Sequence, residues 1–141
     1  MPTSLKPNLM TEDVNRSVEF YRDLLGFRFA AAVAVESREI VTDYQAELPL
    51  QWAMVQRGDA EIMFQSRASL AEDAPHFAEQ PLGASLVLYL EVEGLEELFA
   101  AVKDRVEIVL DLRTTFYGMR EVWIRDCNGY VLTLAEAVMA Q

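Results

Sequence analysis

The segment that decides the expected fold is 116-FYGMREVWIRDCNGYVLTLAE-136. Two apolar runs flank the turn Asp126–Gly129, and its Asn-Gly pair is a strong hairpin signal because both residues tolerate positive φ. Aliphatic residues in the two strands alternate with a mixed set. The aliphatic set is Val122, Ile124, Leu132 and Leu134, and the mixed set is Glu121, Trp123, Val131 and Thr133. One face therefore suits a covering helix, and the other is a candidate binding wall.

The same order of elements is expected twice along the chain. The first set comprises strand 5–10, helix 14–25 (ended by Gly26), and strands 27–36, 50–56 and 60–65, with an irregular loop over 37–49. The second comprises strand 84–92, helix 95–103, and strands 106–112, 119–125 and 130–136. This repeat predicts an α+β fold of two βαβββ modules, which form a curved mixed sheet around a cup with the helices outside.

We expect one domain, 1–141, made of module 1–66, linker 67–83 and module 84–141. The linker is long for a compact domain, so it is either a connector or a mobile flap over the cup.

Composition limits the function classes. A hydrophobic content of 52% provides for a real core, and a formal charge of −11 argues against nucleic acid as a partner. No apolar run has the ~20 residues that span a bilayer, so we expect no membrane association. One cysteine excludes an internal disulfide and, with no export signal, predicts a cytoplasmic protein.

Two stretches of the sequence resemble a known superfamily. The run 8-NLMTEDVNRSVEFYRDLLGFRF-29 resembles the first strand and helix of the vicinal oxygen chelate superfamily, and 117-YGMREVWIRDCNGYVLTLAE-136 resembles its closing hairpin. This superfamily holds glyoxalases, extradiol dioxygenases and bleomycin-resistance proteins. The resemblance implies paired βαβββ modules that form a cup, usually in a homodimer, and leaves the chemistry open.

Metal-using members place one His, Glu or Gln ligand on the first, fourth, fifth and eighth strands. The matching positions here are Lys6, Met63, Val87 and Thr133, and a shift of two residues at Met63 would bring in Glu61 or Gln65. An ammonium, a thioether, an aliphatic group and a hydroxyl do not make a divalent-ion site. We therefore expect no metal and no cofactor, and the pattern is closest to the metal-free, bleomycin-resistance-like branch.

Strand alternation assigns residues to the concave wall, and Phe116, Tyr117 and Met119 at the start of the hairpin are expected to form its lip. The predicted ligand-binding residues are Asn8, Trp52, Met63, Gln65, Tyr89, Glu91, Phe116, Tyr117, Met119, Glu121, Trp123 and Thr133. Aromatic faces with nearby carboxylates suit flat or cationic ligands. Glu91 and Glu121 would attract charge, although solvated positions near the cup rim are the favoured interpretation for Glu61, Glu91 and Glu121.

The predicted function is therefore metal-independent sequestration of a planar or cationic small molecule, with no catalytic residue assigned. A glyoxalase-like lyase or dioxygenase with unusual ligands is the alternative, and a small regulatory dimer whose own side chains fill the cup is a third possibility. Cys127 is expected to be a passive turn residue, and His76 is expected at the surface of the linker.

Overall fold

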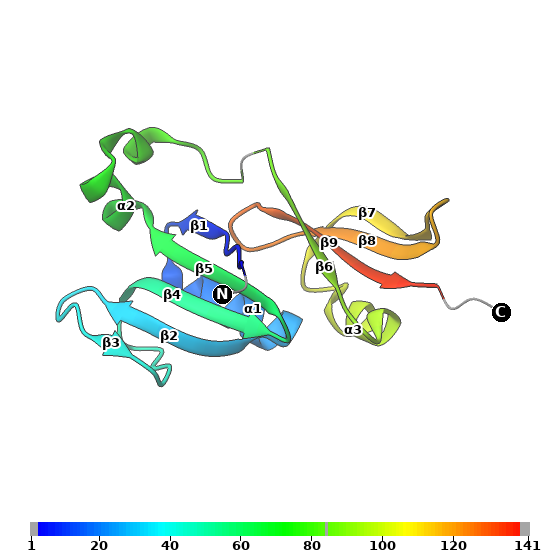
Figure 1. The fold of residues 1–141 in the computed structure, drawn as a ribbon, viewed down its shortest axis with the longest axis horizontal. Helices are drawn as coiled ribbons and strands as arrows, with labels where there is room; N and C mark the ends of the chain where they lie inside the picture. The colour runs from blue at the N-terminus through cyan, green and yellow to red at the C-terminus, as the bar shows by residue number, and fades with distance from the viewer. Residues whose placement is uncertain (1–2, 84, 139–141) are drawn as a thin grey trace. The chain divides into compact units, whose positions relative to one another are not determined.

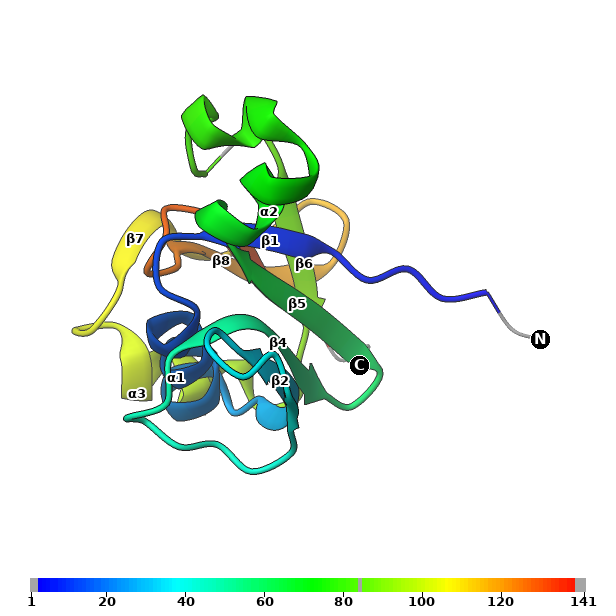
Figure 2. The ribbon, with the colours of Figure 1, turned by 90° about the vertical axis from the view of Figure 1, so that its left-hand side faces the viewer.

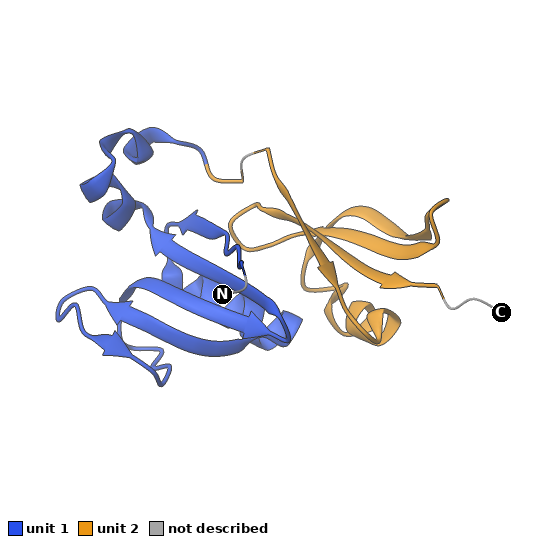
Figure 3. Cartoon of the chain, in the orientation of Figure 1, with its two compact units in different colours: residues 1–81 blue, residues 82–141 orange. Residues whose placement is uncertain are grey.

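The computed structural model describes residues 3–83 and 85–138. The chain divides into two compact units, Met1–Pro81 and Leu82–Gln141 (Figure 3). None of the helices in the described part of the chain is both long and apolar enough to cross a membrane.

Unit 1 is a five-stranded mixed sheet with one long helix against it (Figures 1 and 2). Its elements are β1 (Asn8–Thr11), α1 (Val14–Leu25), β2 (Arg28–Ala34), β3 (Ile40–Val41), β4 (Leu50–Arg57) and β5 (Ala60–Ser66). The strand order is β1-β5-β4-β2-β3, with β1 parallel to β5 and the other pairs antiparallel. The two-residue strand β3 lies within the segment expected to be a loop.

Helix α1 has the boundaries that the sequence predicts, and local chemistry explains them. The Asp13 side chain caps the N-terminus by accepting a hydrogen bond from the Arg16 amide at 3.0 Å. Gly26 ends the helix in the left-handed conformation, at φ 73°. The buried stripe of α1, which includes Val18, Tyr21 and Leu25, packs on one face of the sheet.

The covered face of this sheet holds the core of unit 1. Leu9, Phe64, Ala53 and Ala32 are register partners across four neighbouring strands, and each is at most 4% exposed. The predicted first strand begins too early, because Leu5 is 92% exposed and lies outside β1. The strand pairs from Asn8 onward, where β5 provides a neighbour.

The segment after β5 folds into α2 (Arg67–Asp73) and the 3₁₀ helix η1 (Pro75–Glu79), both within unit 1. Arg67 connects these turns: its Nη1 donates to the carbonyls of Phe77, Ala78 and Gln80, and its Nε pairs with Glu12. His76 lies in η1 and stacks on Phe77, with 4.3 Å between ring centroids.

Unit 2 repeats the topology with a four-stranded sheet. Its elements are β6 (Val87–Glu91), α3 (Leu95–Val102), β7 (Glu107–Thr114), β8 (Met119–Arg125) and β9 (Val131–Ala137). The order β6-β9-β8-β7, with β6 parallel to β9, matches β1-β5-β4-β2 of unit 1. The predicted βαβββ repeat is confirmed; the predicted start of its second half, Ala84, lies outside the described residues.

The hairpin of β8 and β9 has the expected strands and a different turn. Val122, Ile124, Leu132 and Leu134 are fully buried on one face, with Leu95 and Val102 of α3 also buried. In the turn, Gly129 alone has positive φ, at 92°. Asn128 does not, because the Asp126 carboxylate accepts from the amides of Asn128 and Tyr130 and holds the loop.

Candidate functional site

Four side chains of unit 2 converge on the buried carboxylate of Glu121. Tyr89 and Tyr117 donate their phenol hydrogens to Oε2, at 2.8 and 2.6 Å. Trp123 Nε1 donates to Oε1 at 3.4 Å, and the Arg113 guanidinium lies 3.8 Å from the same oxygen. Glu121 is only 1% exposed, whereas Tyr89 is 48% and Tyr117 53% exposed. A thin layer of aromatic side chains therefore covers the carboxylate, and these side chains keep open surface of their own.

The strand register places these groups on one face. Glu121 is paired with Arg113 of β7, and Tyr89 and Trp123 are both register partners of Thr133 on β9. Directly opposite residues point to the same side of a sheet. This face is opposite to the one that carries the buried aliphatic set, as strand alternation predicts.

The electrostatics keep Glu121 ionised and the phenols protonated. Burial alone would raise the pKa of Glu121, but hydrogen bonds from Tyr117, Tyr89 and Trp123 and the charge of Arg113 lower it below 4.5. Burial, together with the hydrogen bond to Glu121, raises the pKa of Tyr89 to about 12. The hydrogen bond to Glu121 is also the main cause that raises the pKa of Tyr117. Neither phenol is an acid catalyst near neutral pH, and Glu121 is a weak base.

The interpretation of Glu121 as a solvated rim residue is wrong. Its strand position was assigned to the correct face, but the covering side chains come from Tyr89, which is 32 residues away in sequence, and from the Thr115–Gly118 turn. Glu91 is exposed on β6, and Glu61 is partly exposed and lies 3.6 Å from Lys6.

The predicted lip residues lie around this cluster. Phe116 is fully exposed and packs edge-on against Tyr117, with 5.0 Å between ring centroids. Met119 begins β8 on the same face as Glu121, and its amide donates to Thr115 Oγ1 at 3.0 Å. The Thr115–Gly118 turn therefore holds Tyr117 over the carboxylate.

The sheet of unit 1 also has a face with polar and aromatic side chains, and the hydrogen-bonded side chains on it are uncharged. Asn8 Nδ2 donates to Gln65 Oε1 at 2.9 Å, and Gln65 Nε2 donates to Ser69 Oγ at 2.9 Å. Trp52 is the register partner of Gln65, and Asn8 is the partner of Met63. The four predicted residues of this unit thus share one sheet face, opposite the core row.

The residues at the superfamily's ligand positions do not fit a divalent ion. Lys6 is a cation, and Met63, Val87 and Thr133 offer a thioether, an alkyl group and a neutral hydroxyl. Across residues 3–83 and 85–138, no group of three or more His, Cys, Asp or Glu side chains lies close enough to hold an ion. The carboxylate of Glu121, which lies on the same sheet face as Thr133, already accepts three hydrogen bonds.

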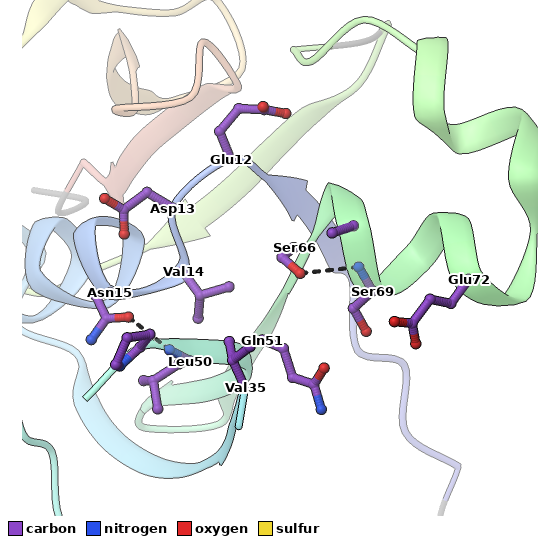
Figure 4. Close-up of a pocket in the computed structure, with 12 residues that line it drawn as sticks. Glu12, Asp13, Val14, Asn15, Val35, Leu50, Gln51, Ser66, Ser69 and Glu72 are labelled. Atoms are coloured by element: carbon purple, nitrogen blue, oxygen red, sulfur yellow. Dashed lines mark hydrogen bonds between the residues drawn. The ribbon is translucent and has the colours of Figure 1, made fainter. Parts of the chain in front are cut away.

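A separate hollow of about 370 Å³ opens in unit 1 between the start of α1, the start of β4 and α2 (Figure 4). Its polar side chains are largely occupied by local structure. Asn15 accepts from the Leu50 amide at 3.0 Å, and Ser66 caps α2 by accepting from the Ser69 amide at 3.1 Å. These contacts stabilise the start of β4 and the N-terminus of α2, so we do not assign the hollow as the site.

Two neighbours of the predicted residues were missed from the sequence. Met54 is the register partner of Met63, so it shares the mixed face of unit 1, and the alternation of β4 could have identified it. Arg113 could not have been found in this way. Register shifts interrupt the pairing of β7 with β8 on both sides of Leu110, and they break the simple alternation.

The sequence matches the Glyoxalase/Bleomycin resistance protein/Dioxygenase superfamily over residues 5–134. The chain therefore belongs to this superfamily. No curated protein shows a significant match.

Solved structures show the same fold at low sequence identity. A protein of unknown function from Agrobacterium tumefaciens str. C58 superposes with a TM-score of 0.73 at 20% identity, covering 98% of this chain and 96% of its own. A glyoxalase/bleomycin resistance protein/dioxygenase family enzyme from Burkholderia phytofirmans PsJN gives 0.70 at 16%, covering 94% and 97%. TioX from Micromonospora sp. ML1 gives 0.66 at 16%, covering 97% and 100%. At these identities the likeness establishes the fold alone.

Proposed function

We propose that this chain is a metal-independent binding protein that sequesters a planar, cationic small molecule, in the manner of the bleomycin-resistance branch of its superfamily. The observation that carries the proposal is the cluster of Tyr89, Tyr117 and Trp123 around the ionised, buried Glu121. The homodimer that the resemblance implies belongs to the same proposal.

The cluster supports stacking of a flat cation. In this structure each ring directs its polar end to Glu121, so the apolar ring surface is the part left for a ligand. Donation of a hydrogen bond to a carboxylate makes a phenol ring richer in electrons, and cation–π attraction grows with that density. Such contacts contribute about 0.5–2 kcal/mol each, depending on how far the ligand is desolvated.

The role of Glu121 differs from the one expected from the sequence. Both of its oxygens accept hydrogen bonds and Arg113 lies 3.8 Å away, so Glu121 positions the rings instead of binding the ligand directly. Chemistry that needs a metal has no matching donor set at Lys6, Met63, Val87 and Thr133, which supports binding over lyase or dioxygenase activity.

The test uses the two tryptophans, of which Trp52 lies in unit 1 and Trp123 in unit 2. In a Trp52→Phe background, Trp123 is the sole indole reporter. Titration with proflavine, a planar cation, is expected to quench it saturably, with the same curve with and without EDTA. Acridone, which is planar and neutral, is expected to bind about tenfold more weakly or worse.

Variants show whether the response comes from this face. Tyr89→Leu is expected to weaken proflavine binding at least tenfold. Tyr44→Leu is the matched control, because Tyr44 donates to a carboxylate of unit 1, Glu19, and is expected to leave the curve unchanged. Absence of saturable quenching by either compound, or stoichiometric metal whose removal abolishes an activity, would overturn the proposal.

A further inference from the structure

One buried polar atom of unit 2 is left without a hydrogen bond. Thr133 is 1% exposed, and its Oγ1 has no partner among the described residues. An unsatisfied buried hydroxyl is destabilising, and in a native protein it calls for an explanation. Thr133 lies on the central strand β9, on the same face as the Glu121 cluster.

Thr133 is placed between the two aromatic residues of neighbouring strands. It is the register partner of Tyr89 on β6 and of Trp123 on β8. Because β9 separates β6 from β8, the hydrogen bond from Tyr89 to Glu121 crosses β9 on this face. In this structure the Tyr89 side chain therefore bars the way to the hydroxyl.

We infer that the Thr133 hydroxyl is the polar anchor of the ligand site, and that a ligand reaches it when Tyr89 swings away from Glu121. The ligand then presents an N–H or O–H donor to Thr133 Oγ1. This inference rests on the proposed function and narrows it to planar compounds with a donor on the ring edge. A donor is the complementary group because the Glu121 carboxylate lies on the same face and disfavours a second acceptor there.

The rotation of Tyr89 away from Glu121 costs little free energy. Its side chain is 48% exposed, so its hydroxyl can exchange the bond to Glu121 for one to water. Glu121 keeps its bonds from Tyr117 and Trp123 and its nearby Arg113, so the carboxylate stays satisfied.

The resulting space fits a single flat group. The backbones of β6 and β8 are two strand spacings apart, about 9.6 Å. Strand side chains stand roughly perpendicular to the sheet, and one ring stacked between two others needs about 7 Å between them. Two stacked layers would need about 10.5 Å, which exceeds this width.

The decisive variant is Thr133→Val, which replaces the hydroxyl by a methyl group of the same shape. In the free protein it is expected to raise the melting temperature, or at least not lower it, because an unsatisfied polar atom is removed. With proflavine, whose amino groups are donors, it is expected to weaken binding about tenfold. Thr133→Ser keeps the hydroxyl and is expected to retain the affinity.

A second ligand tests the role of the donor. Acridine orange carries dimethylamino groups where proflavine has amino groups, so it offers no N–H at those positions. The preference for proflavine is expected in the wild type and in Thr133→Ser, and is expected to disappear in Thr133→Val. A lower melting temperature in Thr133→Val, or equal proflavine affinity in all three proteins, would overturn this inference. Equal, saturable binding would still leave the proposed function standing, whereas no binding at all would remove both.

Discussion

Replacing Glu121 by glutamine is the sharpest test of the cluster that organises unit 2. The carboxylate accepts hydrogen bonds from Tyr89, Tyr117 and Trp123 and lies near Arg113. Glutamine offers one acceptor oxygen in place of two, and its amide hydrogens then face groups that are donors themselves.

The loss of stability depends on which hydrogen-bond partners of Glu121 can form new hydrogen bonds with water. Hydrogen bonds to a charged group contribute about 1.5–3 kcal/mol when buried, but the two phenols are half exposed and recover much of their loss in solvent. The remaining loss is that of the buried acceptor and of its contacts with Trp123 and Arg113. We therefore expect Glu121→Gln to lower the free energy of unfolding of unit 2 by about 2 kcal/mol at pH 7.

The assay is urea unfolding followed by Trp123 fluorescence in a Trp52→Phe background, so that unit 2 reports alone. With a slope of about 1–2 kcal/mol/M, the midpoint should fall by about 1–2 M. The matched control is Glu91→Gln on the same sheet, where the carboxylate is exposed, and it should leave the midpoint nearly unchanged.

The pH dependence separates the charge from the shape of the side chain. The pKa of Glu121 is lowered in the folded protein, so its stabilisation is complete above about 4.5 and is lost as the pH falls through the folded value. The difference between the wild type and Glu121→Gln should therefore shrink from pH 6 to pH 3. A midpoint that does not move at pH 7, or a difference that is constant with pH, would refute the reasoning.

Two further predictions concern the phenols and the glycines of unit 2. Ultraviolet titration should show Tyr89 ionising near pH 12. Because its pKa is raised in the folded protein, Tyr89 contributes stability that is complete below about pH 10 and is lost as the pH approaches 12. The Glu121→Gln substitution should move the pKa values of Tyr89 and Tyr117 towards that of a free tyrosine. A Cβ at Gly83 would lie 2.8 Å from the Gly129 carbonyl oxygen, whereas a Cβ at Gly129 meets nothing within 4 Å. Thermal unfolding should therefore show Gly129→Ala costing only about 1–2 kcal/mol, the strain of its positive φ, and Gly83→Ala costing more; equal losses would contradict this.

Local signals in the sequence were sufficient for the elements and the covered faces. The helical spacing from Val14 to Leu25, the Gly26 stop and the alternation around the turn Asp126–Gly129 each depend on a few neighbouring residues. The local backbone geometry determines each of these features without contributions from the rest of the chain. The repeat then followed from their order along the sequence.

The environment of Glu121 could not be predicted in the same way. Alternation assigns a residue to a face of the sheet, but it does not say whether that residue is exposed to solvent. Glu121 is buried because Tyr89 reaches it across β9 and because the Thr115–Gly118 turn brings Tyr117 back over it. Both are contacts between elements, and the turn has no Asn-Gly or Pro-Gly signal that would predict its shape.

The contacts that bury Glu121 also decide which ligands unit 2 can accept. A metal ion at this carboxylate would have to displace hydrogen bonds from two phenols and an indole, and would stand near the positive charge of Arg113. A flat cation does not need the carboxylate as a ligand, because it stacks on the faces of the rings. The arrangement that removes Glu121 as a metal ligand is thus the one that creates the aromatic surface, and a variant that frees the carboxylate should weaken stacking at the same time.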